Sequence, residues 1–225
     1  MNLHTEVLIR PNRSWFNFEW RELWEYRDLL WLLVRRDWVS KYKQTVLGPL
    51  WFILQPVLTS VVFTIVFGQI AQIPTDNLPP YLFYLCGMLM WSYFSTNLNS
   101  TATTFSSNAH LFGKVYFPRL IIPLSTSLSN LFALGIQALT FAGFWLYYKF
   151  ATESSDRFSL GQEIIFLPLV VLLMMMLSLG VSLWMSSLSA KYRDFSHLLG
   201  FLTQLWLYAT PVVYPLSEVP ENGAG

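Results

Sequence analysis

The sequence predicts an all-α integral membrane protein, in which an N-terminal amphipathic interface helix precedes five transmembrane helices. Three observations support this fold class. The 225-residue chain is 54% hydrophobic and only 12% charged, whereas soluble domains carry about 25% charged residues. The segment 45–75 contains no charged residue and no histidine, although about 20 apolar residues already span a bilayer. Further uncharged runs follow. We therefore expect a cytoplasmic N-terminal part at 1–44 and a transmembrane domain at 45–225.

The first expected element begins near Phe18. Apolar residues recur there at steps of three and four, which is typical of an amphipathic helix. We expect this helix to lie in the membrane interface, because several tryptophans favour the depth of the lipid headgroups. The alternative is a cytoplasmic helix that packs on a partner protein. The stripe consists of Trp20, Leu23, Trp24, Arg27, Leu30, Trp31, Val34 and Trp38.

The five spans are expected at about 46–73, 81–105, 120–148, 164–190 and 198–217. The second span is aromatic and aliphatic in its first half and rich in hydroxyl and amide side chains over 95–108. Lipid disfavours so many polar groups, so we expect them to face other helices or a water-filled cavity at the cytoplasmic end.

Two further patterns concern the packing of the spans. Small residues that repeat every four positions allow two membrane helices to approach closely, and the fourth span carries Ser178, Ser182, Ser186 and Ala190 in this spacing. Proline interrupts helical hydrogen bonding. We therefore expect bends in the first and fifth spans at Pro49, Pro56, Pro211 and Pro215.

The distribution of basic residues predicts the orientation. Eight of the 14 Lys and Arg residues lie at or before Lys43, and cytoplasmic flanks are enriched in such residues. The loops that this orientation places inside carry Lys114, Arg119, Lys191 and Arg193, while the outer loops carry Lys149 and Arg157 among more numerous acids. The N-terminus is therefore expected in the cytoplasm.

Several classes of chemistry lack a sequence signature. The chain has no glycine-rich phosphate-binding motif and no His/Cys metal cluster, so we expect it to bind no metal and no cofactor. The spans contain no charged residue, which argues against a carrier driven by protons or sodium. The net charge of +1 gives no indication of nucleic-acid binding. Any energy should therefore come from a partner.

Four segments, in chain order, resemble landmarks of ABC-2 type permeases: KYKQTVLGPLWFILQPVL, KVYFPRLIIPL, SAKYRDFSHLL and TPVVYPLSEVP. The resemblance extends from about Trp24 to Pro220 and is greatest to permeases that export O-antigen, capsule or teichoic acid. It implies a homodimer in the bacterial inner membrane with two copies of a separate ABC ATPase, which binds ATP and Mg. A lipid-linked polysaccharide would pass between the protomers. The family has six spans, and the sixth helix is not present in this chain. With five spans its C-terminus would be external.

The resemblance also suggests functional residues. The two cytoplasmic loops would dock on the ATPase through His110, Phe112, Lys114, Tyr116, Arg119, Lys191, Arg193, Asp194 and His197. Alternatively, these charges meet only headgroups and water. In the family the first and fifth helices line the canal, and aromatic rings cover sugar faces well. This points to Trp51, Phe52, Phe63, Phe67, Trp206, Tyr208 and Tyr214, although most aromatics pack helices or form interfacial belts.

Two other functions stay open. An ABC-2 permease can instead export a drug or a lipid. A membrane-embedded transferase acting on lipid-linked sugars would need an acid or base in the membrane. Only His110 and His197 offer one, and both lie at predicted cytoplasmic boundaries.

Overall fold

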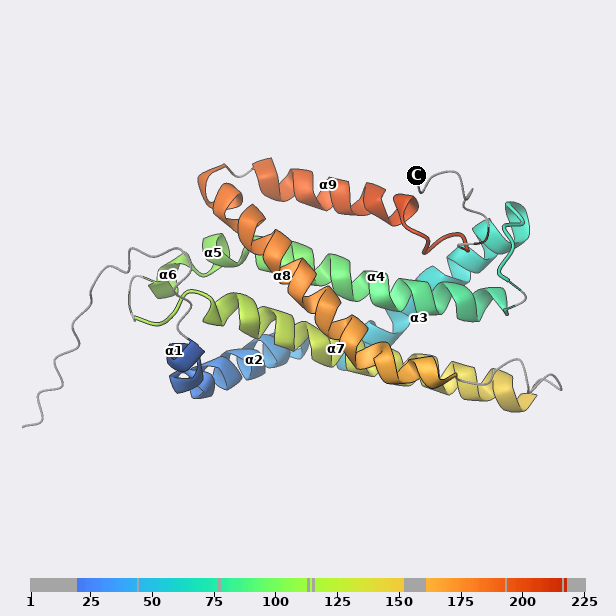
Figure 1. Ribbon diagram of the computed structural model, residues 1–225, viewed down its shortest axis with the longest axis horizontal. Coiled ribbons are helices and arrows are strands. Elements are labelled where there is room, and N and C mark those ends of the chain that lie inside the picture. Colours follow the sequence, from blue (N-terminus) through green and yellow to red (C-terminus); the bar gives the residue numbers. More distant parts are fainter. Residues whose placement is uncertain are drawn as a thin grey trace, which may run out of the picture.

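The computed structural model describes residues 20–43, 45–76, 78–112, 114, 116–151, 161–192, 194–215 and 217. In these ranges every regular element is a helix, and the longer helices run side by side in one bundle (Figure 1). Two N-terminal helices, α1 (Trp20–Glu25) and α2 (Arg27–Tyr42), precede them. The bundle consists of η1 (Gly48–Leu50) with α3 (Trp51–Phe63) and η2 (Thr64–Ile70), α4 (Pro80–Ala102), α7 (Ile121–Ala151), η4 (Gln162–Phe166) with α8 (Leu167–Lys191), and α9 (Asp194–Ala209).

Within the described residues, three helical segments are long and apolar enough to cross a membrane. They are Gly48–Ile70, Ile121–Ala151 and Ile164–Lys191, and each coincides with a predicted span. Helix α4 has 23 residues, but its second half is polar. Helix α9 has 16 residues. Both lie in the same bundle as the three apolar segments.

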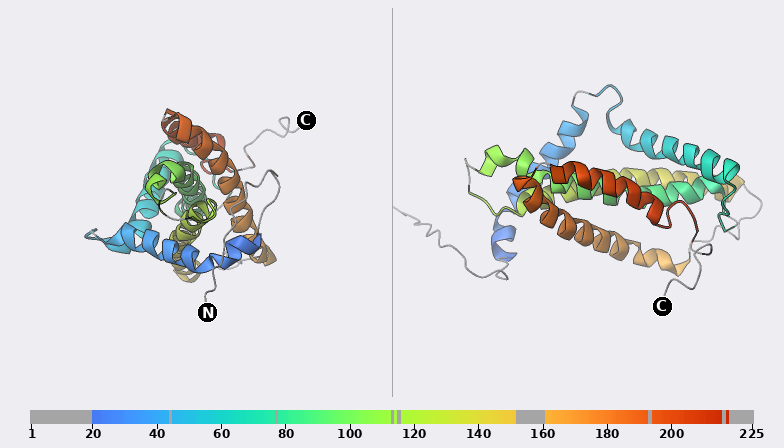
Figure 2. Two further views of the ribbon diagram at one scale, coloured as in Figure 1. Left: turned by 90° about the vertical axis from the view of Figure 1, so that its left-hand side faces the viewer. Right: turned by 90° about the horizontal axis from the view of Figure 1, so that it is seen from above.

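Helix α4 is central to the packing. It contacts α3, α7, α8 and α9, and the end-on view in Figure 2 places it among the other helices. Helix α8 has the opposite character, because its buried residues are serines: Ser178, Ser182, Ser186 and Ser189. Its large apolar side chains, such as Leu173 and Met176, are exposed. Polar groups inside and apolar groups outside are the arrangement that lipid requires.

The serine face of α8 differs from the predicted stripe at its last position. Ser189 is buried, whereas Ala190 is exposed. The serine face packs on α4, where Asn97 Nδ2 donates to Ser178 Oγ at 2.6 Å. A further close approach lies at Gly87 on α4. A Cβ atom there would lie 3.1 Å from Val212 Cγ1 and 3.2 Å from its carbonyl oxygen. The segment after α9 therefore packs directly on the backbone of α4.

The helix found in the region of the predicted fifth span is shorter and begins earlier than expected. Helix α9 starts at Asp194 and ends at Ala209, so Pro211 and Pro215 lie beyond the helix and do not bend it. Proline lacks the N–H group that would continue the helical hydrogen bonds. The turn at 210–215 follows.

In the first span, Pro49 opens the short helix η1, where a missing N–H group costs nothing. It follows Gly48, whose φ of +49° is strained for residues with a side chain. Pro56 is the one of the four predicted prolines that lies inside an α-helix, α3. The span ends in a π-helical segment, Thr64–Ile70, which the sequence pattern did not indicate.

The predicted N-terminal helix is divided at Tyr26. Its inner face contains Leu33 and Val34, which are 5% and 2% exposed. Leu33 packs with Phe117, which precedes α7, and with Ile121 and Ile122 at the start of α7. The predicted stripe is therefore split, because Val34 faces the bundle while Trp24 and Trp31 are 70% and 62% exposed. These two rings are available to the membrane interface.

Candidate functional site

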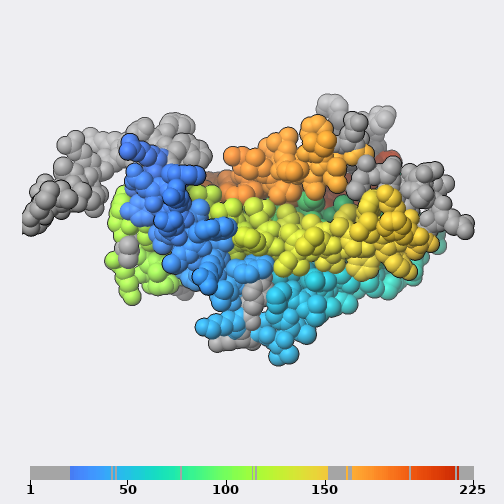
Figure 3. All heavy atoms as spheres, turned by 90° about the horizontal axis from the view of Figure 1, so that it is seen from below, coloured from blue at the N-terminus to red at the C-terminus, as the bar shows by residue number. Residues whose placement is uncertain are grey.

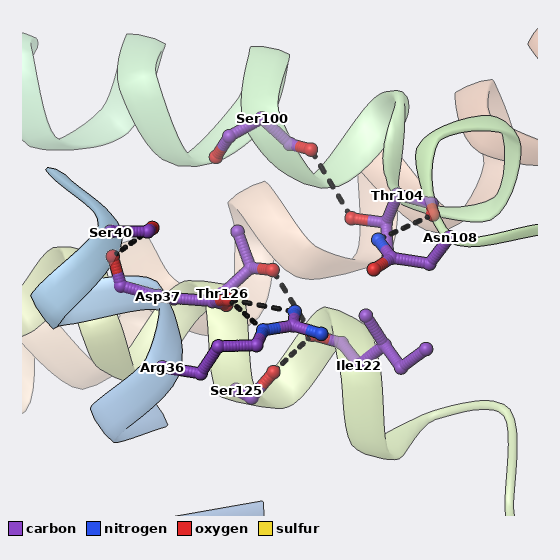
Figure 4. A network of polar contacts seen from close by, with 9 residues as sticks. All are labelled: Arg36, Asp37, Ser40, Ser100, Thr104, Asn108, Ile122, Ser125 and Thr126. Carbon is purple, nitrogen blue, oxygen red and sulfur yellow. Dashed lines mark hydrogen bonds and ion pairs between the residues drawn. The ribbon is translucent and has the colours of Figure 1, made fainter. Parts of the chain in front are cut away.

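A polar recess of about 260 Å³ lies at the α2 end of the bundle. Four helices contribute to it, and Figure 4 shows several of the side chains from α2, α4, the one-turn helix α5 (Thr104–Ser107) and α7. The lining residues are Arg36, Asp37, Ser40, Lys41, Thr96, Ser100, Thr104, Ser107, Asn108, Thr126, Ser129 and Asn130.

The charged side of the recess comes from α2. Arg36 Nη2 lies 2.7 Å from Asp37 Oδ1, and Ser40 Oγ donates to the backbone oxygen of Asp37 at 2.9 Å. These contacts stay within one helix. They fix the rotamers of the side chains on the α2 wall without tying that wall to α4 (Figure 4).

Hydroxyl groups form the opposite wall. Thr104 Oγ1 donates to the carbonyl of Ser100 at 3.2 Å, and Thr126 Oγ1 donates to that of Ile122 at 3.1 Å. Ser129 differs, because its buried Oγ has no hydrogen-bond partner among the described residues. A buried hydroxyl without a partner is costly, so Ser129 is a group that a molecule in the recess would satisfy.

A chain of hydrogen bonds connects the recess to the far side of the bundle. Lys41 Nζ donates to Asn130 Oδ1 at 2.9 Å. Asn130 Nδ2 donates to Asn97 Oδ1 and Ser100 Oγ, both at 3.1 Å. Asn97 Nδ2 then donates to Ser178 Oγ at 2.6 Å. These bonds join α2, α7, α4 and α8.

Lys41 is the charged end of this chain. The residue as a whole is exposed, but its ammonium group reaches inward to Asn130. Loss of hydration lowers the pKa of Lys41, and the nearby Asp37 carboxylate opposes this effect. Arg36 is paired with Asp37, whereas the Lys41 ammonium group is held by a neutral amide oxygen. The lining of the recess therefore carries a net positive charge.

The sequence predicted one wall of this site and missed the other. The polar half of the second span was expected to face helices or a cavity, and it does both: Asn97 contacts α8, while Thr96, Ser100 and Thr104 line the recess. Ser129 and Asn130 were not anticipated. A signal existed, because an asparagine in an apolar span usually faces the bundle interior.

The predicted coupling residues gather at the same end of the molecule (Figure 1). His110 and Phe112 lie in the one-turn helix α6 (Ala109–Phe112). Asp194 and His197, expected in a loop, lie in the first turns of α9. An acidic residue in the first turn stabilises a helix, which explains the earlier start. Arg193 lies outside the described residues. The exposed members are His110, Lys114, Tyr116, Arg119, Lys191, Asp194 and His197.

The aromatic residues of the first loop divide into two groups. Phe112 stacks on Phe117, with ring centroids 5.5 Å apart, and meets Phe105 edge to face at 5.8 Å. This chain therefore half-buries Phe112 without a partner. Tyr116 is 59% exposed, and its hydroxyl donates to Glu22 at 3.3 Å. Tyr116 therefore keeps more than half of its surface exposed beside this contact.

The predicted pathway aromatics also differ in exposure. Phe52 stacks on Trp38 at 5.9 Å, while Phe63 and Phe67 pack on Tyr84 of α4 at 6.2 and 6.3 Å. Tyr214, beyond the end of α9, donates to the backbone oxygen of Ala209 at 3.2 Å. Large exposed ring surfaces belong to the remaining three residues, Trp51 at 50%, Trp206 at 46% and Tyr208 at 53%.

The described residues contain no group of three or more His, Cys, Asp or Glu side chains that could hold a metal ion. Helices α3 and α9, which carry most of the predicted pathway aromatics, both pack against α4. The described residues therefore form a helical bundle with a polar recess at its α2 end and exposed aromatic surface on two helices that pack against α4.

Comparison with known families identifies this architecture. The sequence profile of the ABC-2 type transporter family matches residues 28–222. The chain belongs to the ABC-2 type transporter family. It is thus the membrane subunit of a transporter and not an enzyme, and it is a multi-pass membrane protein. An ABC ATPase is the partner that this family of permeases implies.

Similar proteins narrow the comparison. The permease is 32% identical over 206 residues to the O-antigen export system permease protein RfbA of Myxococcus xanthus, covering 91% of this chain and 75% of that protein. It is 26% identical over 195 residues to two proteins of the same name from Klebsiella pneumoniae, covering 87% of this chain and 72% of each.

Proposed function

We propose that this permease belongs to an ATP-driven exporter that moves a lipid-linked polysaccharide across the bacterial inner (cytoplasmic) membrane. The observation that carries the proposal is the match, over 91% of the chain, to a permease named for O-antigen export. The uncharged spans agree with it, because a long polymer must slide without being held at a fixed charge.

The assembly we propose contains two copies of this chain and two copies of the ABC ATPase. ATP and Mg would bind to the ATPase, and this chain would bind no cofactor. The N-terminus would lie in the cytoplasm. This orientation is supported by the basic residues of α2 and of the loops at the same end, where Lys114, Arg119 and Lys191 are exposed.

The polysaccharide would pass along the surfaces of α3 and α9, between the two copies. Sugar rings present flat C–H faces that aromatic rings can cover. Trp51, Trp206 and Tyr208 have the exposed rings for this role. Phe52, Phe63 and Phe67 would instead support α3 against α2 and α4, because their rings are engaged in contacts within the chain.

Coupling to ATP hydrolysis would occur at the α2 end of the bundle. Exposed basic residues on the first loop and Lys191 at the end of α8 would contact the ATPase, with the Tyr116 ring as the anchor. The hydrogen-bond chain from Lys41 to Ser178 supports this proposal. It joins α2 to α7, α4 and α8, so that a displacement at that end reaches all four helices.

The proposal is tested by deleting the chromosomal copy and fractionating the glycan. We expect lipid-linked glycan to accumulate on the cytoplasmic side and to disappear from the cell surface, with recovery when the intact gene is returned. Surface glycan at the wild-type level would contradict polysaccharide export and favour a drug or lipid as the cargo.

A further inference from the structure

A second recess on α2 adjoins the polar one at Arg36 and Ser40, which line both. It has a volume of about 460 Å³ and is lined by Leu32, Arg35, Arg36, Val39, Ser40 and Lys43. Three of these side chains are cationic and none is acidic. Arg36 is paired with Asp37, whereas Arg35 and Lys43 make no ion pair in the part of the chain that the structure describes.

The basic recess continues into an apolar trough between α2 and α7, the two helices seen side by side in Figure 3. Leu32 and Arg35 also line the next cavity, of about 430 Å³, together with Trp31, Trp38 and Phe132. The Phe132 ring lies 6.1 Å from Trp31 and 5.5 Å from Trp38. The basic recess is thus continuous with a cavity lined by aromatic rings.

A third cavity, of about 590 Å³, extends the trough along α7. Trp31 and Phe132 line it as well, and its other residues lie between Leu128 and Leu139. Eleven residues of helix rise about 16 Å, which is about one leaflet of a 30 Å bilayer core. The trough therefore has the length of a phospholipid acyl chain, with cationic groups at one end.

We propose that this surface is a binding site for an anionic phospholipid. The headgroup phosphate would lie between Arg35 and Lys43, and one acyl chain would fill the trough beside Phe132. Charge complementarity selects the occupant, because basic recesses at the headgroup level attract anionic lipids. Exposed tryptophan at the junction marks the same depth.

The trough has a notch at Gly135. A Cβ atom there would meet nothing within 4 Å, and the same is true of Gly143 further along α7. Gly135 lines the trough, whereas Gly143 does not. A leucine at Gly135 would therefore occupy the acyl-chain position without disturbing the fold, and Gly143→Leu is the matched control.

The test measures lipid retention by native mass spectrometry of the purified full-length chain. Phosphatidylglycerol and phosphatidylcholine with the same acyl chains are added separately. We expect preferential retention of phosphatidylglycerol. The double variant Arg35→Gln/Lys43→Gln should bind it about twenty-five-fold more weakly, since each basic residue near an anionic headgroup contributes about a factor of five. Arg21→Gln, an exposed position on α1, is the control for charge.

A second pair of variants tests the acyl-chain part of the site. Gly135→Leu should lose both lipids, whereas Gly143→Leu should retain them, with circular dichroism verifying the fold of each. Equal retention of the two lipids by the wild-type chain, or equal effects of the two leucine variants, would overturn the proposal. Displacement of phosphatidylglycerol by a polyprenyl phosphate at lower concentration would also overturn it, because the occupant would then be the export substrate.

Discussion

Replacing Asn130 with leucine is expected to destabilise the bundle more than replacing Asn97, although both side chains belong to one hydrogen-bond chain. Asn97→Leu removes two interhelical hydrogen bonds. Its former partners keep others, because Asn130 still meets Ser100 and Ser178 still donates to a backbone carbonyl at 3.0 Å. At about 0.6 kcal/mol for each bond in a membrane, the expected loss is about 1 kcal/mol.

Asn130→Leu has a different consequence. It removes the bonds to Asn97 and Ser100 and leaves Asn97 Oδ1, which is fully buried, without its donor. A buried polar atom without a partner costs about 1–3 kcal/mol. Lys41 regains water through its exposed stem, so its lost contact adds little. The expected loss is about 3 kcal/mol.

The double variant gives the sharpest contrast. Adding Asn97→Leu to Asn130→Leu removes the orphaned oxygen, so stability should rise by about 1 kcal/mol relative to Asn130→Leu alone. Unfolding of the purified chain in bicelles by titration with dodecyl sulfate measures each value. Thr140→Val is a control, because its hydroxyl contacts only the Ile136 carbonyl of its own helix. A double variant less stable than Asn130→Leu would refute the reasoning.

Three further predictions concern packing, coupling and transport. Gly87→Val should lower the unfolding temperature in detergent, since a Cβ there meets Val212, whereas Gly180→Ala, with open space at that position, should not. Lys114→Glu should leave ATP hydrolysis by the assembled transporter intact while abolishing export, and unchanged export would remove the loop from the coupling interface. Tyr208→Ala, at a ring that is 53% exposed, should reduce export at least several-fold without altering the melting temperature, and export at the wild-type rate would show that the ring lies off the path.

The spans were predictable because lipid imposes a simple requirement. A long uncharged run such as 164–190 is stable as a helix within the bilayer. The observed helical segment Ile164–Lys191 has nearly the same bounds. The predicted helix boundaries are wrong where single residues determine the end of a helix. Asp194 stabilises the start of α9 inside a predicted loop, and Pro211 ends that helix early. The hydropathy pattern does not indicate the break at Tyr26 or the π-helical end of the first span.

Of the polar recess, the sequence predicted only the wall formed by the polar half of the second span. Polar residues over 95–108 indicate that something polar must face them, but a sequence gives no account of which helix provides it. The pairing of Asn97 with Ser178 and Asn130 depends on the packing of three helices. Phe112 shows the same limit, because its cover comes from Phe105 and Phe117 in the same chain.

The central claim, that this permease moves a polysaccharide with energy from a partner ATPase, is tested most directly in proteoliposomes. The chain is reconstituted with the ATPase, and a fluorescent lipid-linked glycan is placed in the leaflet that the ATPase faces. Its appearance in the opposite leaflet is followed by digestion with a glycosidase confined to that side. We expect digestion that requires ATP and both proteins. Digestion at the same rate without ATP, or none with the complete system, would contradict the account.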